Sequence, residues 1–271
     1  MPLAPNGNIS IHYETRGDGP PLLLLMGWQG NRTWWPESLL SRLTPHFRLI
    51  LTDHRGTGRS GDNPGLYTLG TLARDAIAVL DTLGIERAHV LGVSMGGMVA
   101  QELALCYPER LRHLILMSTT ARPGIIRGLS REQQKAWFSY LLQRDRTMQE
   151  FLLDLLFSRD TKANPTPAIE GFLERRNKEQ TPKSTVLRQY LALQMFNSRR
   201  RLKRIKSPTL VITGSNDLII AAHHAHDLQK RIPGAQLHEV HGGSHAMLAT
   251  EAEELADVIV AFLHREKQPA P

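Results

Sequence analysis

Short, dense runs of apolar residues alternate with helically spaced apolar stripes over the first 120 positions of the chain. The runs have the length of buried strands and comprise Leu22–Met26, Phe47–Thr52, Ala88–Leu91 and Leu111–Met117. The clearest stripe repeats every three or four residues from Leu69 to Leu80 and predicts a helix capped by Thr68. Strands that alternate with helices predict an α/β fold, with a mostly parallel sheet and helices on both faces.

Weaker patterns precede and follow these elements. Ile9–Tyr13 alternates apolar and polar residues and predicts an early, exposed strand. Trp34–Leu43 has helical spacing, with Pro36 tolerated only in the first turn because proline has no amide hydrogen. Met95–Tyr107 is expected to form a helix that Pro108 terminates, and its single cysteine, Cys106, is expected to be buried.

The alternation stops after Thr120, and about 85 residues follow in which no strand is predicted. Helical stripes occur instead, one from Met148 to Leu156 and another from Leu187 to Met195. The α/β pattern resumes with the predicted strands Thr209–Thr213 and Gln236–Val240, each followed by a helix. We therefore predict an α/β core made of residues 1–120 and 207–271, with residues 121–206 inserted as a helical cap.

The net charge of +7 is concentrated in this insertion, where 19 Lys and Arg face 8 Asp and Glu between Ala121 and Lys206. The densest basic run, Arg199–Arg204, lacks interleaved aromatic residues and a nucleic-acid-binding motif, so no nucleic-acid partner is expected. No apolar run reaches the length of a membrane span. The N-terminal residues Met1–Gly7 do not resemble a secretory signal, and one cysteine cannot form an internal disulfide, so a cytoplasmic location is expected.

Candidate chemistry begins with a Gly-x-Ser-x-Gly motif formed by Gly92, Ser94 and Gly96, between a predicted strand and a predicted helix. A serine at the apex of such a turn has a strained backbone, and its neighbours two positions away must lack side chains because other backbone passes close by. The hydroxyl is then exposed at a helix N-terminus, where the Met95 amide can stabilise an oxyanion. The motif predicts a nucleophilic serine.

A nucleophilic serine needs a general base and a carboxylate that orients the base, in the chain order serine, acid, histidine. Asp217 and His245 follow successive predicted strands, so both are expected at the sheet edge where Ser94 lies. His241 is the close rival to His245, which lies farther past the strand and beyond two glycines. Asp53 and Asp75 precede the serine and fit the order poorly.

A glycine-rich segment and a histidine cluster are interpreted as structural features and not as binding sites. The glycine-rich segment Asp53–Gly61 lacks the Walker spacing, and we interpret Asp53 and Arg55 as residues that stabilise a turn. The cluster His223-His224-Ala225-His226 has no second ligand group at metal-binding spacing, so neither a metal nor another cofactor is expected.

Taken together, these motifs resemble the α/β-hydrolase superfamily, of the capped, single-domain kind. The matching segments are Gly92–Gly97, Asp53–Ser60, Pro208–Gly214, Asp217 and Gly243–His245. The resemblance implies that Ser94 is the nucleophile, Asp217 the orienting acid and His245 the general base. It also implies an oxyanion hole formed by the backbone amides of Trp28 and Met95. Many relatives have His-Gly where this chain has Met26-Gly27.

The function expected from this resemblance is hydrolysis of a small-molecule ester or lactone through an acyl-enzyme on Ser94. C–C bond hydrolases and cofactor-free perhydrolases use the same triad, and a ligand receptor with slow turnover can share the fold. Trp137 and Phe138 of the insertion are expected to line the acyl pocket. The basic residues of the insertion either form a solvated outer face or attract anionic substrates.

Overall fold

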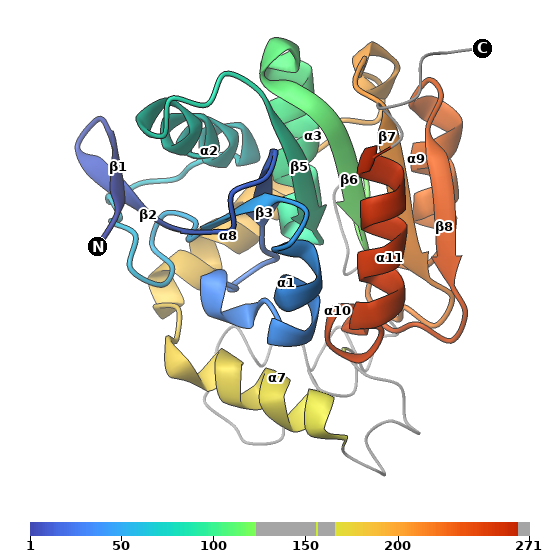
Figure 1. The fold of residues 1–271 in the computed structure, drawn as a ribbon. Coiled ribbons are helices and arrows are strands. Elements are labelled where there is room, and N and C mark those ends of the chain that lie inside the picture. The colour runs from blue at the N-terminus through green and yellow to red at the C-terminus, as the bar shows by residue number, and fades with distance from the viewer. Residues whose placement is uncertain (123–155, 157–165, 265–271) are drawn as a thin grey trace.

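The computed structural model describes residues 1–122, 156 and 166–264 (Figure 1). Eight strands form one sheet in the order β1-β2-β4-β3-β5-β6-β7-β8, in which β2 is antiparallel to both of its neighbours, β1 and β4, and all other neighbouring strands are parallel. The strands are β1 (Leu3–Asn6), β2 (Ile9–Arg16), β3 (Pro21–Leu25), β4 (Arg48–Thr52), β5 (Ala88–Val93), β6 (Leu111–Met117), β7 (Thr209–Gly214) and β8 (Gln236–Val240). The predicted, mostly parallel α/β sheet is confirmed.

The parallel strands are buried on both faces, and this explains why they occur in the sequence as continuous apolar runs. Every residue of β5 and β7 is buried, and β3 and β4 are buried except at their first residues. The β1 strand was not predicted, because its four residues carry too short a pattern. It pairs with β2, and four of the five residues in Ile9–Tyr13, the segment predicted to be exposed, are buried.

Helices cover both faces of the sheet, as predicted (Figure 1). One face packs against α2 (Leu69–Thr82), α3 (Met95–Cys106) and α9 (His223–Arg231). The other packs against α1 (Glu37–Leu43), α10 (Met247–Thr250) and α11 (Ala252–Leu263). Two separate apolar layers therefore hold the central strands rigidly in place.

Local residue chemistry determines several helix ends. Thr68 caps α2, because its hydroxyl accepts the Thr71 amide, and Gly84 follows that helix with a φ of 65°. The helix predicted from Trp34 begins only at Glu37, because Pro36 stands at its N-cap in an extended conformation. Cys106 is the last residue of α3 and is exposed, so its predicted burial was wrong.

Two helices of the predicted insertion lie at the carboxyl ends of the strands (Figure 1). They are α7 (Pro167–Lys178) and α8 (Lys183–Met195), and α8 confirms the helix predicted around Leu187–Met195. Whether residues 121–206 form a separate cap stays a prediction. The predicted pocket residues Trp137 and Phe138 lie outside the described residues. Within the described part of the chain, no helix is long and apolar enough to cross a membrane.

Candidate active site

The Gly-x-Ser-x-Gly motif forms a sharp turn between β5 and α3, with Ser94 at its apex. Ser94 has φ 55° and ψ −117°, a conformation that a residue with a side chain rarely adopts. The backbone on both sides fixes it: the Ser94 amide donates to the Met117 carbonyl at 2.9 Å, and its carbonyl accepts from the Thr119 hydroxyl at 2.7 Å. The surrounding sheet and helix therefore maintain the strained turn.

Crowding around Ser94 explains both flanking glycines, as the motif predicted. A Cβ at Gly92 would lie 2.3 Å from the Gly96 carbonyl oxygen. A Cβ at Gly96 would lie 2.0 Å from the carbonyl oxygen of Leu25 on β3. Neither position has room for a methyl group, so the spacing of the motif follows from close backbone approach.

Asp217, His245 and Ser94 meet in one continuous series of hydrogen bonds. His245 Nδ1 lies 2.8 Å from Asp217 Oδ2, and His245 Nε2 lies 3.2 Å from Ser94 Oγ. The second carboxylate oxygen of Asp217 accepts the amides of Ile219 at 2.9 Å and Ile220 at 2.7 Å. Asp217 is buried, and its fixed carboxylate holds the imidazole in the orientation that presents Nε2 to the serine.

The rival residues lie elsewhere or have other partners. His241 is exposed, whereas His245 lines the pocket beside Ser94. Asp75 forms a bidentate ion pair with Arg55, with N–O distances of 2.6 and 2.7 Å. Asp53 is fully buried in a different network, so Asp53 and Arg55 stabilise the loop through separate partners rather than as a pair.

The network around Asp53 connects the loop after β4 to the end of α7. Arg32 donates to Asp53 at 2.8 Å and, through both of its terminal nitrogens, to Glu179 at 2.7 Å. Asp53 also accepts the amides of Arg32 and Arg59 and contacts His12 at 3.1 Å. Burial is the main cause of the lowered pKa of His12, which keeps that imidazole neutral.

The loop after β3 is held by α8 and the residues before it. Gln29 has φ 65°, its amide donates to Gln189 Oε1 at 2.9 Å, and its carbonyl accepts from the Thr181 hydroxyl at 2.7 Å. The indole nitrogen of Trp28 donates to the Val186 carbonyl at 3.1 Å. These contacts fix the backbone around Trp28, one of the two predicted oxyanion donors.

Met95, the other predicted donor, is the first residue of α3, so its amide has no acceptor inside the helix. At Met26-Gly27, where the resemblance led us to expect His-Gly, the Met26 carbonyl is held by another side chain. His54 Nε2 donates to the Met26 carbonyl at 2.9 Å, and burial lowers the pKa of His54. Sequence reasoning did not identify this contact, which joins residues 28 positions apart.

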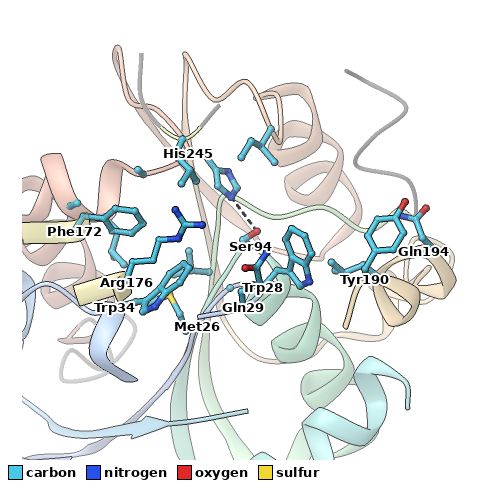
Figure 2. A pocket seen from close by; sticks show the side chains of 18 residues that line it. Met26, Trp28, Gln29, Trp34, Ser94, Phe172, Arg176, Tyr190, Gln194 and His245 are labelled. Carbon is cyan, nitrogen blue, oxygen red and sulfur yellow. Dashed lines mark hydrogen bonds between the residues drawn. The ribbon is translucent and has the colours of Figure 1, made fainter. Parts of the chain in front are cut away.

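A mostly apolar pocket opens above Ser94 and His245 (Figure 2). Sequence reasoning missed several of its aromatic residues, which come from the loop after β3 and from α7 and α8. Trp34 and Phe172 meet edge to face with ring centroids 5.6 Å apart, and Trp28 lies 6.4 Å from Tyr190. The described wall contains no Asp or Glu, but it does contain one cationic side chain, Arg176.

The histidine cluster is explained by local contacts. His224 Nδ1 lies 3.0 Å from the Thr120 hydroxyl, and the rings of His223 and His224 are 4.1 Å apart. No group of three or more His, Cys, Asp or Glu side chains is placed to hold a metal ion within residues 1–122, 156 and 166–264.

Comparisons with known proteins identify the family. A family model described as "alpha/beta hydrolase fold" matches residues 20–252. A relative from Azorhizobium caulinodans, named "Putative carbamate hydrolase RutD", is 30% identical over an alignment that covers 97% of this chain and 98% of the relative.

Solved structures are similar over the same length. A thermophilic esterase from Thermogutta terrifontis is 26% identical, with a TM-score of 0.84 and 98% of each chain covered. An enol-lactonase from Burkholderia xenovorans is 26% identical, with a TM-score of 0.85 and coverage of 97% of this chain and 99% of that one. The chain thus belongs to the α/β-hydrolase family and is an α/β-fold hydrolase.

Proposed function

We propose that this chain is a serine hydrolase that cleaves a small-molecule ester or lactone through an acyl-enzyme on Ser94. The observation that carries the proposal is the hydrogen-bond series from Asp217 through His245 to Ser94, at the base of a mostly apolar pocket. An esterase and an enol-lactonase among the similar structures support the choice of substrate class.

In the first step, Ser94 Oγ attacks the substrate carbonyl carbon while His245 Nε2 takes the hydroxyl proton. The Asp217 carboxylate accepts the Nδ1–H hydrogen bond and stabilises the imidazolium that forms. A serine hydroxyl is a weak nucleophile without such a base, so the 3.2 Å contact between Oγ and Nε2 is the geometry on which this step depends.

The tetrahedral intermediate carries its negative charge near the backbone amides of Trp28 and Met95, which act as the oxyanion hole. His245 then gives its proton to the leaving oxygen, and the ester C–O bond breaks. Water, deprotonated by the same histidine, attacks the acyl-enzyme and releases the acid. In a lactone the leaving oxygen belongs to the same molecule, so one hydroxy acid is released.

We also propose that residues 121–206 form a cap over a core of residues 1–120 and 207–271. The contacts of Trp28 and Gln29 with α8 support this division, because they join the insertion to the sheet edge beside Ser94. Trp137 and Phe138 remain candidate pocket residues. The cytoplasmic location and the lack of a nucleic-acid partner stay predictions from sequence.

A carbamate is a second candidate substrate, since a relative 30% identical to this chain carries the name of a carbamate hydrolase. The same nucleophile attacks a carbamate carbonyl, and the nitrogen then leaves in place of an alcohol. C–C bond hydrolysis, perhydrolysis and a receptor role use the same fold and are distinguished by assay.

The test is a substrate panel of p-nitrophenyl esters, aliphatic esters, lactones and carbamates, run with the wild type and Ser94→Ala. Turnover of esters or lactones that is lost in Ser94→Ala supports the proposal. Turnover of carbamates alone would show that the substrate is a carbamate and not an ester or lactone. Tight ligand binding without turnover of any panel member would favour the receptor role.

A further inference from the structure

Arg176 brings a positive charge into the wall of the pocket above Ser94. The residue lies on α7, is partly buried, and lines the same pocket as Ser94 and His245. Figure 2 shows its side chain extending into the pocket on the side of Ser94 where Phe172 and Trp34 also lie. The guanidinium group is therefore placed among apolar side chains close to the reactive serine.

No acidic group of the protein compensates this charge within the part of the chain that the structure describes. The described lining of the pocket contains no Asp or Glu, and Arg176 has no hydrogen-bond or ion-pair partner among the described residues. Three other arginines from the second half of the predicted insertion do form ion pairs, namely Arg188 with Asp62, Arg199 with Asp227, and Arg201 with Glu102. Arg176 is the arginine whose side chain lines the pocket, and no described residue occupies its donors.

Physical chemistry favours an anion at this position. A guanidinium that is partly removed from water without a counter-charge loses hydration that nothing replaces. The apolar surroundings lower the local dielectric constant and strengthen the attraction to any anion that enters. The planar, forked donors of arginine match the two oxygens of a carboxylate.

We propose that Arg176 binds a carboxylate of the substrate, so that the natural substrate is an acidic ester or lactone with a free carboxylate near the scissile carbonyl. This inference rests on the proposed ester or lactone hydrolysis at Ser94. The carboxylate lies on the Trp34 and Phe172 side of the serine, opposite the side formed by Trp28 and Tyr190 (Figure 2).

Lys178 provides a matched control on the same helix. It lies two residues after Arg176 and carries the same charge, but its side chain is 56% exposed and pairs with Glu174 at 3.6 Å. Replacing Lys178 removes one positive charge from α7 without touching the pocket. Long-range attraction of anions by the basic insertion would respond to both replacements, whereas direct contact depends on Arg176 alone.

The experiment measures kcat/KM for monomethyl esters of malonic, succinic, glutaric and adipic acids and for the corresponding neutral dimethyl esters. The readout is the ratio of the two values, acidic over neutral, at the preferred chain length. Losing a charge-assisted hydrogen bond weakens binding of the charged group roughly 10- to 100-fold, so Arg176→Met should lower the ratio by about that factor. Arg176→Lys should retain part of the ratio, and Lys178→Met should leave it within about twofold. An unchanged ratio in Arg176→Met would overturn the proposal.

A binding measurement separates this inference from the proposed function. The same monomethyl esters are titrated by calorimetry into Ser94→Ala and into the double variant Ser94→Ala/Arg176→Met. Binding that weakens roughly 10- to 100-fold in the double variant supports the carboxylate site even if the wild type hydrolyses none of the esters. Equal binding to both proteins refutes the site, while turnover of neutral esters by the wild type would still support the serine hydrolase.

Discussion

Adding a single methyl group at Gly96 should disrupt the packing on which the serine turn depends. A Cβ at this position would lie 2.0 Å from the Leu25 carbonyl oxygen, 2.6 Å from the Leu25 carbonyl carbon and 2.7 Å from the Met26 carbonyl oxygen. Two of these atoms belong to the last residue of β3 and the third to the residue after it. Because β3 pairs with strands on both sides, it cannot move away without breaking ladder hydrogen bonds.

The expected magnitude follows from two opposing effects. Overpacking in a close-packed region costs about 1–3 kcal/mol and more where backbone blocks relaxation, which places Gly96→Ala at the upper end or beyond. Alanine favours a helix over glycine by about 1 kcal/mol, which offsets part of the cost. We expect a net loss of about 2–4 kcal/mol and a Tm lower by roughly 5–15 °C in a chain of this size.

Gly70→Ala is the matched control, since Gly70 is also the second residue of a helix. A Cβ there meets only the Thr68 hydroxyl oxygen, at the ordinary contact distance of 3.5 Å. This variant should be as stable as the wild type or more stable by up to about 1 kcal/mol. The stabilities of Gly96→Ala and Gly70→Ala are measured by thermal and urea unfolding, followed by circular dichroism. Equal stability of Gly96→Ala and Gly70→Ala would refute the argument from crowding.

Two further predictions concern the triad and acid stability. Asp217→Asn should lower kcat about 10⁴-fold and His245→Ala by on the order of 10⁶, because the carboxylate only orients the base that moves the proton. Steady-state kinetics check this, and full activity of Asp217→Asn would require another acid. Burial, with the neighbouring His113, lowers the pKa of His89 from 6.5 to about 3. The unfolded chain therefore binds a proton there that the folded chain does not, and stability should fall by about 2 kcal/mol between pH 7 and pH 5. His89→Leu should flatten this fall in urea unfolding, and an unchanged pH dependence would contradict the assignment.

Much of the fold and the candidate site could be predicted from the sequence because both depend on residues close together along the chain. Strands buried on both faces leave apolar runs, as β5 does with six buried residues. Ser94, Asp217 and His245 each follow a strand of the same parallel sheet. The predicted positions of the strands were therefore enough to predict that these residues lie at one edge of the sheet.

The contacts of Asp53 could not be predicted, because they come from distant parts of the chain. The sequence predicts that Asp53 stabilises a turn, but it does not predict the buried contact with Arg32, which in turn binds Glu179 at a separation of 147 residues. No local pattern contains such a pairing. In the sequence, a buried charged residue cannot be distinguished from a charged residue of the same type on the surface.

The orientation of the insertion helices was also not available from the sequence. In α7 only Ile169 and Phe172 are buried, and charged residues occur on several sides of the helix. So weak an apolar stripe does not specify which of its arginines points inward. The placement of Arg176 in the pocket depends on how α7 packs against Trp34, a residue more than 100 positions earlier.

Covalent labelling with a fluorophosphonate tests the central claim most directly. Peptide mass spectrometry after labelling should find one adduct, on Ser94, whose formation is slowed in His245→Ala and absent in a folded Ser94→Ala protein. Labelling of a different residue, or ester turnover by Ser94→Ala at the wild-type rate, would contradict the account.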